Sequence, residues 1–246
     1  MEKKEINPVD AIVDELLKEV PTETELTIEL PSRSTCYSNK SPVVLKPMRL
    51  GDELAIAAAK KGSGKPIDIL LSRVLPGFSP DELFLVDKIY VMLKLREISN
   101  GEVIQSAIPC SECETINDIA IKIPDLPVEY LPTDFKDPRD ITLPLCKRKL
   151  TIRSPRSRDE AYLKDQEIII KNLWRFVLAV EDYKDAKIIE AFLSKLKNKD
   201  YNFLISELML LNYGVQTTVK FKCSNKDCNK VNVTRLPLGS DFLSEN

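Results

Sequence analysis

Histidine is absent from this chain of 246 residues. Its absence removes the Ser/His and Cys/His pairs that activate many nucleophiles, the HExxH metal sites, and the commonest general base. Carboxylates are plentiful, but no pair of them stands out from what the solvated faces of helices would carry. We find no set of residues that indicates catalysis, and we therefore expect a protein that is not an enzyme.

Glycine is scarce, with seven residues in the chain. The segment Gly62-Ser-Gly-Lys65 has a partial likeness to a phosphate-binding loop. However, Ala59 stands where such a loop requires its first glycine, and Pro66 replaces the Ser or Thr that should follow the lysine. We interpret the segment as a turn between two helices.

A large excess of positive charge is also missing. The chain has 36 Lys and Arg against 38 Asp and Glu, a net charge of -2, whereas general nucleic-acid binders are usually basic. The N-terminus lacks the apolar stretch of a signal peptide. The most apolar long stretch, residues 168–180, contains Lys171 and Arg175 and is too short to span a bilayer. The default expectation is a cytoplasmic protein.

Four of the six cysteines form two matched knuckles, Cys110-Ser-Glu-Cys113 and Cys223-Ser-Asn-Lys-Asp-Cys228. The residues that follow also match, with Ile116-Asn117 corresponding to Val231-Asn232. The flanking segments alternate between apolar and polar residues, which predicts half-buried strands and places each knuckle in the bend of a hairpin. Two such bends can direct four thiolates at one zinc ion, as in a zinc ribbon.

The predicted zinc site joins distant parts of the chain. Residues 114–222 separate the knuckles, far more than in a compact ribbon, so the metal would act as a clamp between residues 102–123 and 216–236. A site with four thiolates has no open position and is structural rather than catalytic. The alternative is four ordinary buried cysteines. The surplus negative charge could be offset by lysines around the second knuckle: Lys220, Lys222, Lys226 and Lys230.

Two cysteines remain, Cys36 and Cys146, and neither has a cysteine neighbour at ligand spacing. We expect both to be dispensable for metal binding. A metal pattern with two unpaired cysteines suits a reducing compartment better than a disulfide scaffold does.

The order of predicted elements indicates an α+β fold, with helical blocks and short β-hairpins joined by the zinc-ribbon-like site of four cysteines. Strands are predicted at 26–30 and 43–46, and helices at 52–61, 67–75, 79–96, 157–180, 188–196 and 201–211. The proline-rich residues 124–155 predict extended chain, including a small hairpin of 143–146 with 150–152. We expect residues 1–24 to form an arm with an amphipathic helix at 8–20, and residues 25–246 to form a single domain.

Two helix starts carry capping-box patterns, one at Ser79 with Glu82 and one at Ser157 with Glu160. The first of these helices is apolar almost all round, which predicts burial on most sides. The charged residues Asp87, Lys94 and Arg96 sit in its apolar run. We expect them to extend to the surface or to pair with a neighbouring helix.

An ordered set of short motifs resembles the baseplate hub and hub-assembly proteins of T-even-type contractile-tailed bacteriophages. Pro31-Ser32 and Tyr37 precede a short strand that ends at Pro47, and Asp52-Glu53 opens the first helix. The later motifs are Asp87 before Leu95-Arg96, Gly101 before the first knuckle, and, after the second knuckle, Leu236-Pro237-Leu238 and Asp241-Phe242. The resemblance covers residues 25–125 and 216–243. Arg33-Ser34, where the family often has glycine, the wider second knuckle, and Leu243 in place of an aromatic residue depart from the pattern.

The resemblance implies a structural or assembly protein of the baseplate hub that binds other hub and tail proteins. It implies a location in the host cytoplasm during assembly, and in the virion tail if the protein stays in the particle. We expect the binding surface to involve residues 8–20 and 124–155, because neither has an obvious mate within the chain. The alternative function is that of a zinc-ribbon nucleic-acid-binding or transcription factor.

Overall fold

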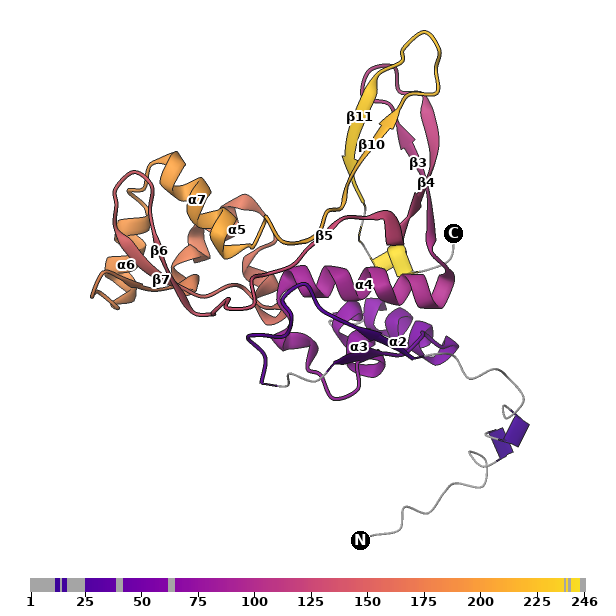
Figure 1. Cartoon of the computed structure of the whole chain (residues 1–246), viewed down its shortest axis with the longest axis horizontal. Helices are drawn as coiled ribbons and strands as arrows, with labels where there is room; N and C mark the ends of the chain where they lie inside the picture. Colours follow the sequence, from indigo (N-terminus) through magenta and orange to yellow (C-terminus); the bar gives the residue numbers. More distant parts are fainter. Residues whose placement is uncertain are drawn as a thin grey trace.

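The computed structural model describes residues 12–13, 15–16, 25–38, 42–61, 65–236, 238 and 240–243. Helices and small antiparallel sheets are mixed along the chain, which confirms the predicted α+β class. The long helix α4 (Leu85–Asn100) runs through the centre, and two β-hairpins project from it on the side opposite α2 and α3 (Figure 1). None of the described helices is long and apolar enough to cross a membrane.

The first hydrophobic core lies below α4. Strands β1 (Leu26–Ile28) and β2 (Val43–Leu45) pair antiparallel, and helices α2 (Leu50–Lys61) and α3 (Pro66–Val74) pack with them. Both helices occur where the sequence predicts them. The fully buried side chains of this core include Leu45, Leu70, Leu71 and Leu95. Burial of these apolar side chains provides the main driving force for this part of the fold.

A second core forms beside the first. The antiparallel sheet has the order β6 (Arg139–Thr142), β7 (Lys149–Ile152) and β8 (Val177–Val180). Helices α6 (Ala186–Leu193) and α7 (Asn198–Leu208) pack side chains into this core, whereas α5 (Gln166–Asn172) has no buried residue and lies against the neighbouring 3₁₀ turns. Leu150 and Phe176 lie at its centre with Leu204 of α7, all almost fully buried.

The projecting part consists of two hairpins, β3 (Val103–Pro109) with β4 (Ile116–Lys122), and β10 (Thr218–Lys222) with β11 (Val231–Arg235). A third core at their base contains Ile104, Ile121 and Leu236, which pack with Leu93 of α4. The short pair β5 (Val128–Glu129) and β9 (Gly214–Val215) closes the base. Five 3₁₀ turns complete the described elements: Pro80–Glu82, Ile123–Asp125, Ser157–Tyr162, Leu173–Phe176 and Ser240–Leu243.

The helix predicted from Ser79 begins later than expected. Residues Pro80–Glu82 form a single 3₁₀ turn without a side-chain cap, Leu83 and Phe84 are extended, and α4 starts at Leu85. The interruption has a tertiary cause, because the Leu83 carbonyl accepts a hydrogen bond from the Ser157 amide. It places Leu83 and Phe84 fully inside the first core.

The helix predicted at 157–180 is wrong over much of its length. A 3₁₀ turn comes first, in which the Asp159 carboxylate, and not that of Glu160, accepts a hydrogen bond from the Arg156 amide at 2.9 Å. The α-helical part is limited to α5. Residues Val177–Val180 form strand β8, which pairs with β7. These apolar residues also occur at helical spacing, but the β-branched valines suit a strand, and pairing with β7 decides the outcome.

The extended residues 124–155 do have mates within the chain, contrary to expectation. Strand β5 pairs with β9, and β7 lies between β6 and β8. The predicted small hairpin exists, but its first strand is β6 at Arg139–Thr142 rather than 143–146. Internal pairing therefore replaces the unmated strands that the sequence predicts at 124–155. The helix predicted at 8–20 lies mostly outside the described residues.

The charged residues of α4 differ from one another in their environment. Lys94 pairs with Glu97 of the same helix, with a distance of 2.7 Å from Nζ to Oε2. Asp87 is fully buried and binds the loop at Ser32 and Tyr37 rather than a neighbouring helix. Arg96 is buried, and its Nη1 atom has no hydrogen-bond partner among the described residues.

Candidate metal centre

The two knuckles share two backbone features, although the second is two residues longer. The Cys110 amide donates to the Thr115 carbonyl at 2.9 Å, and the Cys223 amide donates to the Lys230 carbonyl at 2.8 Å. Directly after the second cysteine of each knuckle, the backbone turns into the left-handed region, with φ of 58° at Glu114 and 51° at Asn229. The matching sequences therefore fold in matching ways, and each loop turns its cysteine side chains inward.

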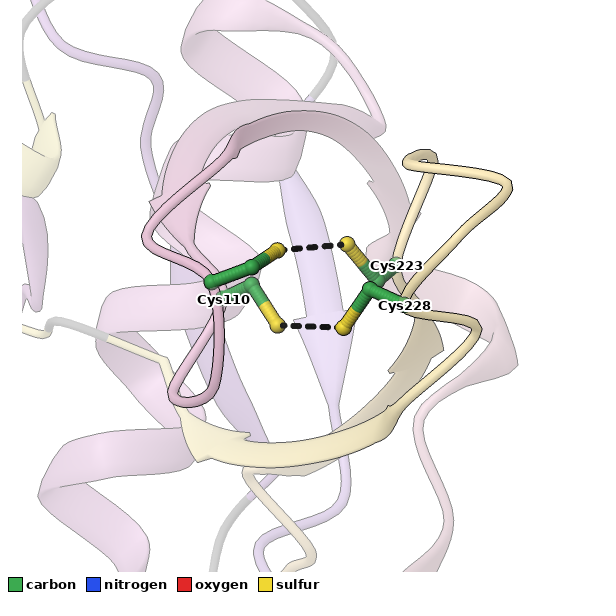
Figure 2. A group of neighbouring side chains, drawn as sticks. Cys110, Cys223 and Cys228 are labelled. Atoms are coloured by element: carbon green, nitrogen blue, oxygen red, sulfur yellow. Dashed lines mark hydrogen bonds between the residues drawn. The ribbon is translucent and has the colours of Figure 1, made fainter.

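The structure brings the four predicted ligands together from the two hairpins. The Sγ atoms of Cys110 and Cys228 are 3.8 Å apart, and those of Cys113 and Cys223 are 3.6 Å apart. In Figure 2, Cys110 of the first hairpin faces Cys223 and Cys228 of the second, and dashed lines join the sulfur pairs. All four sulfur atoms lie within 4.8 Å of one another. The chain therefore has a compact cluster of four free thiols.

The spacing of the sulfur atoms suits a tetrahedral metal ion. A Zn–S bond of about 2.3 Å gives sulfur atoms about 3.8 Å apart at the corners of a regular tetrahedron. The distances between Cys113 and Cys223 and between Cys110 and Cys228, 3.6 Å and 3.8 Å, are close to that value. Four sulfur donors without a carboxylate favour a thiophilic ion over magnesium or calcium. The cluster can thus hold one metal ion and leaves no position open for a substrate.

Two asparagines tie each knuckle to the opposite hairpin. Asn117 of β4 accepts a hydrogen bond from the Ser224 amide at 2.7 Å, and Asn232 of β11 accepts one from the Ser111 amide at 3.0 Å. Both asparagines are buried. They occupy the same place, four residues after the second cysteine, and each acceptor serves the residue after the first cysteine of the other knuckle. The cluster therefore has an approximate twofold arrangement.

The sulfur atoms also receive hydrogen bonds from the protein. The side-chain amide of Asn232 donates to Cys110 at 3.4 Å, and that of Asn225 lies 3.9 Å from the sulfur of Cys113. Donors of this kind favour thiolate over thiol, and they fix the orientation of metal ligands. The sequence match at Asn117 and Asn232 was visible, but their function depends on contacts between hairpins that the sequence does not reveal.

The four thiols differ in acidity when no metal is bound. The backbone amides of Cys113 and Glu112 lower the pKa of Cys110 to about 6, and the Thr115 hydroxyl lowers the pKa of Cys113. Burial raises the pKa of Cys223. The Lys230 amide lowers the pKa of Cys228, but burial and the neighbouring sulfur atoms raise it to about 12. The first hairpin therefore supplies thiolate readily, whereas the second holds its protons until a cation displaces them.

The lysines near the second knuckle and the two remaining cysteines are placed differently relative to the sulfur cluster. Lys230 pairs with Glu112 of the opposite knuckle, with 3.6 Å between Nζ and Oε2. Lys220 and Lys222 are exposed on β10. Cys36 is half-buried beside the Phe135 carbonyl, and Cys146 is exposed in the turn between β6 and β7. Neither cysteine belongs to the cluster.

We expect the replacement of Asn232 by alanine to weaken the contact between the hairpins. The Ser111 amide and hydroxyl both donate to its Oδ1, and a lost hydrogen bond at a buried site costs about 1–3 kcal/mol. Urea unfolding would measure the loss of stability. The exposed Asn202 of α7 provides a control, because Asn202→Ala should change stability little. Equal effects of the two substitutions would contradict a role for Asn232 in joining the hairpins.

Comparison with known protein families places almost the whole chain in one family. The family model described as T4 bacteriophage base plate protein matches residues 22–243. The chain belongs to this family. The match confirms the resemblance to T4-type baseplate proteins and covers both hairpins and all three cores of this base plate protein. No curated protein and no solved structure matches the chain. Membership of the family supports a structural role in the phage baseplate.

Proposed function

We propose that this protein is a hub or hub-assembly component of the phage baseplate and that it acts by binding other tail proteins. The observation that carries the proposal is the family match over residues 22–243. The chain without histidine and the closed cluster of four cysteines favour binding over catalysis. The protein would meet its partners in the host cytoplasm during tail assembly, and a hub component, unlike an assembly factor, would then remain in the virion tail.

The cysteine cluster contributes to this function by holding one structural zinc ion. Cys110, Cys113, Cys223 and Cys228 would be its ligands, and zinc would supply four bonds between two hairpins that share no strand pairing among the described residues. In this proposal residues 25–246 form one unit closed by the metal, and residues 1–24 form an arm. Elemental analysis of protein purified without chelator should find one zinc ion per chain. Protein free of metal would overturn this part of the proposal.

Two experiments test the role in the baseplate. Mass spectrometry of purified phage particles should detect this chain if it remains in the virion, and co-expression with candidate hub proteins should yield a complex on size-exclusion chromatography. A pure assembly factor would form the complex but be missing from particles. The proposal fails if the chain is missing from particles and forms no complex with any tail protein.

A further inference from the structure

The outer face of the second hairpin differs in charge from that of the first. Five exposed side chains form what we call the cationic face: Lys220, Lys222, Val231, Val233 and Arg235. It has no acidic side chain, and no ion pair involves its three cations within the described part of the chain. The two valines are 58% and 62% exposed. An apolar strip bordered by unpaired cations is a typical composition for a surface that binds an acidic partner.

The first hairpin serves as an internal comparison. Its outer face carries Asp118 and Lys122 on β4, with Ala120 between them and Ala107 of β3 facing Asp118. The charges on that face balance, although both hairpins have the same pairing and the same knuckle. The cationic face is therefore a property of the second hairpin and not a requirement of the metal site.

The backbone register leaves β10 able to accept another strand. Hydrogen bonds from Cys223 to Lys230 and from Leu236 to Thr217 mark the alternate pairs that bond across the hairpin. The intervening pairs, Lys222 with Val231 and Lys220 with Val233, are therefore the non-bonded ones. Their amides and carbonyls point away from the partner strand. Within the described residues this sheet has two strands only, so the outer edge of β10 is open.

The first hairpin protects the corresponding edge. Pro109 of β3 faces Ile116, as Lys222 faces Val231 in the second hairpin. Proline has no amide hydrogen, and natural proteins use it to block pairing at sheet edges. Strand β10 contains no proline. The second hairpin thus differs from the first both in the edge of its sheet, which contains no proline, and in the charge of its outer face.

We propose that the open edge of β10 binds an extended acidic segment of another baseplate protein as an added strand. Carboxylates at every second position of that segment would lie beside Lys220 and Lys222, because side chains on one face of neighbouring strands are about 5 Å apart. None of the five side chains of the cationic face is aromatic, so the face lacks the stacking surface that single-stranded nucleic acids use. This inference rests on the proposed function and adds the chemistry of the partner.

The test uses the purified full chain and a fluorescent ten-residue peptide of alternating Glu and Val. Fluorescence anisotropy should show binding that weakens with added salt. The double variant Lys220→Glu with Lys222→Glu should bind at least about tenfold more weakly, because two attractive pairs become repulsive. The control, Gln105→Glu with Lys122→Glu, also makes the first hairpin more negative, by three charge units instead of four, and should bind like the wild type. If the charge reversal impairs folding, Lys220→Gln with Lys222→Gln replaces it.

Two further probes decide between modes of binding. A peptide of the same sequence with N-methyl groups on alternate amides should not bind, because it cannot add to the edge of a sheet. A ten-nucleotide oligo(dT) should bind more weakly than the peptide. The proposal is overturned if the peptide does not bind, if N-methylation has no effect, or if oligo(dT) binds more tightly. None of these results would contradict the proposed function, which is tested separately by co-elution with baseplate proteins.

Discussion

Replacement of Cys223 by serine is expected to remove the metal and to separate the C-terminal hairpin from the first. The hairpins belong to two separate sheets, and their contacts near the tip include the sulfur cluster, the two asparagine bridges and the ion pair of Lys230 with Glu112. Structural zinc contributes about 10–16 kcal/mol in isolated zinc fingers. We expect only part of that energy here, because the first two cores do not involve the cluster.

The measurements are the metal content, the melting temperature and limited proteolysis. Cys223→Ser should lower the first two and should expose residues 216–246 to cleavage. Cys146→Ser provides the control, since Cys146 is exposed and lies outside the cluster. If residues 216–246 of Cys223→Ser resist protease as well as those of the wild type do, the metal does not hold the hairpins together.

The same cluster predicts a dependence of metal affinity on pH. Zinc binds thiolates, so the cation must displace the protons that Cys223 and Cys228 retain through their raised pKa values. Affinity should therefore fall as the pH is lowered, and it should fall further as Cys110, with a pKa of about 6, becomes protonated. Titration with zinc in a weakly buffered solution should release acid. Binding without proton release would show that four thiolates already exist in the free protein.

The metal cluster could be predicted because its signal is local and repeated. Each knuckle has its own short spacing and its own alternating strands, and the two copies support one another. The bridges formed by Asn117 and Asn232 could not be predicted in the same way. Each amide contacts a residue more than 100 positions away in the chain, and an asparagine four residues after a cysteine does not identify its partner.

The prediction of secondary structure from the sequence is wrong where a contact between distant segments overrides the local preference of the chain. Residues Val177–Val180 fit the helical stripe that begins at Tyr162, yet their pairing with β7 makes them a strand. Helix α4 begins later than predicted for a similar reason, because hydrogen bonds at Leu83 and Phe84 hold those residues in an extended conformation. The ends of helices α2, α3 and α7 were predicted to within a few residues. Each of these helices has an apolar stripe that faces a single core, the first core for α2 and α3 and the second for α7.

A buried polar network below α4 underlies the last prediction. Asp87 accepts hydrogen bonds from the Ser32 amide at 2.9 Å and from the Tyr37 hydroxyl. That hydroxyl in turn accepts a hydrogen bond from the Phe84 amide at 2.8 Å. Burial raises the pKa of Asp87 and also raises the pKa of Tyr37 well above its ordinary value. The network thus joins the loop after β1 to the first residues of α4.

Arg156 extends the same network towards the second core. Its guanidinium lies 3.8 Å from the centre of the Phe84 ring and 5.3 Å from that of Tyr37. It also donates to the Glu82 carbonyl at 2.9 Å and pairs with Asp137 at 3.2 Å. Tyr37 is therefore connected, through Arg156, to the segment that leads into the second core.

Replacement of Tyr37 by phenylalanine should destabilise the protein by about 2–6 kcal/mol, because two buried groups lose a hydrogen-bond partner at about 1–3 kcal/mol each. The Phe84 amide loses its acceptor, and the Asp87 carboxylate loses a donor, while the shape of the ring is kept. Denaturant unfolding of the metal-loaded protein would measure the change. Tyr183→Phe should have an effect within about 0.5 kcal/mol, because its side chain is 59% exposed. Similar stabilities for the two variants would mean that the hydroxyl of Tyr37 adds nothing to the connection between α4 and the loop that follows β1.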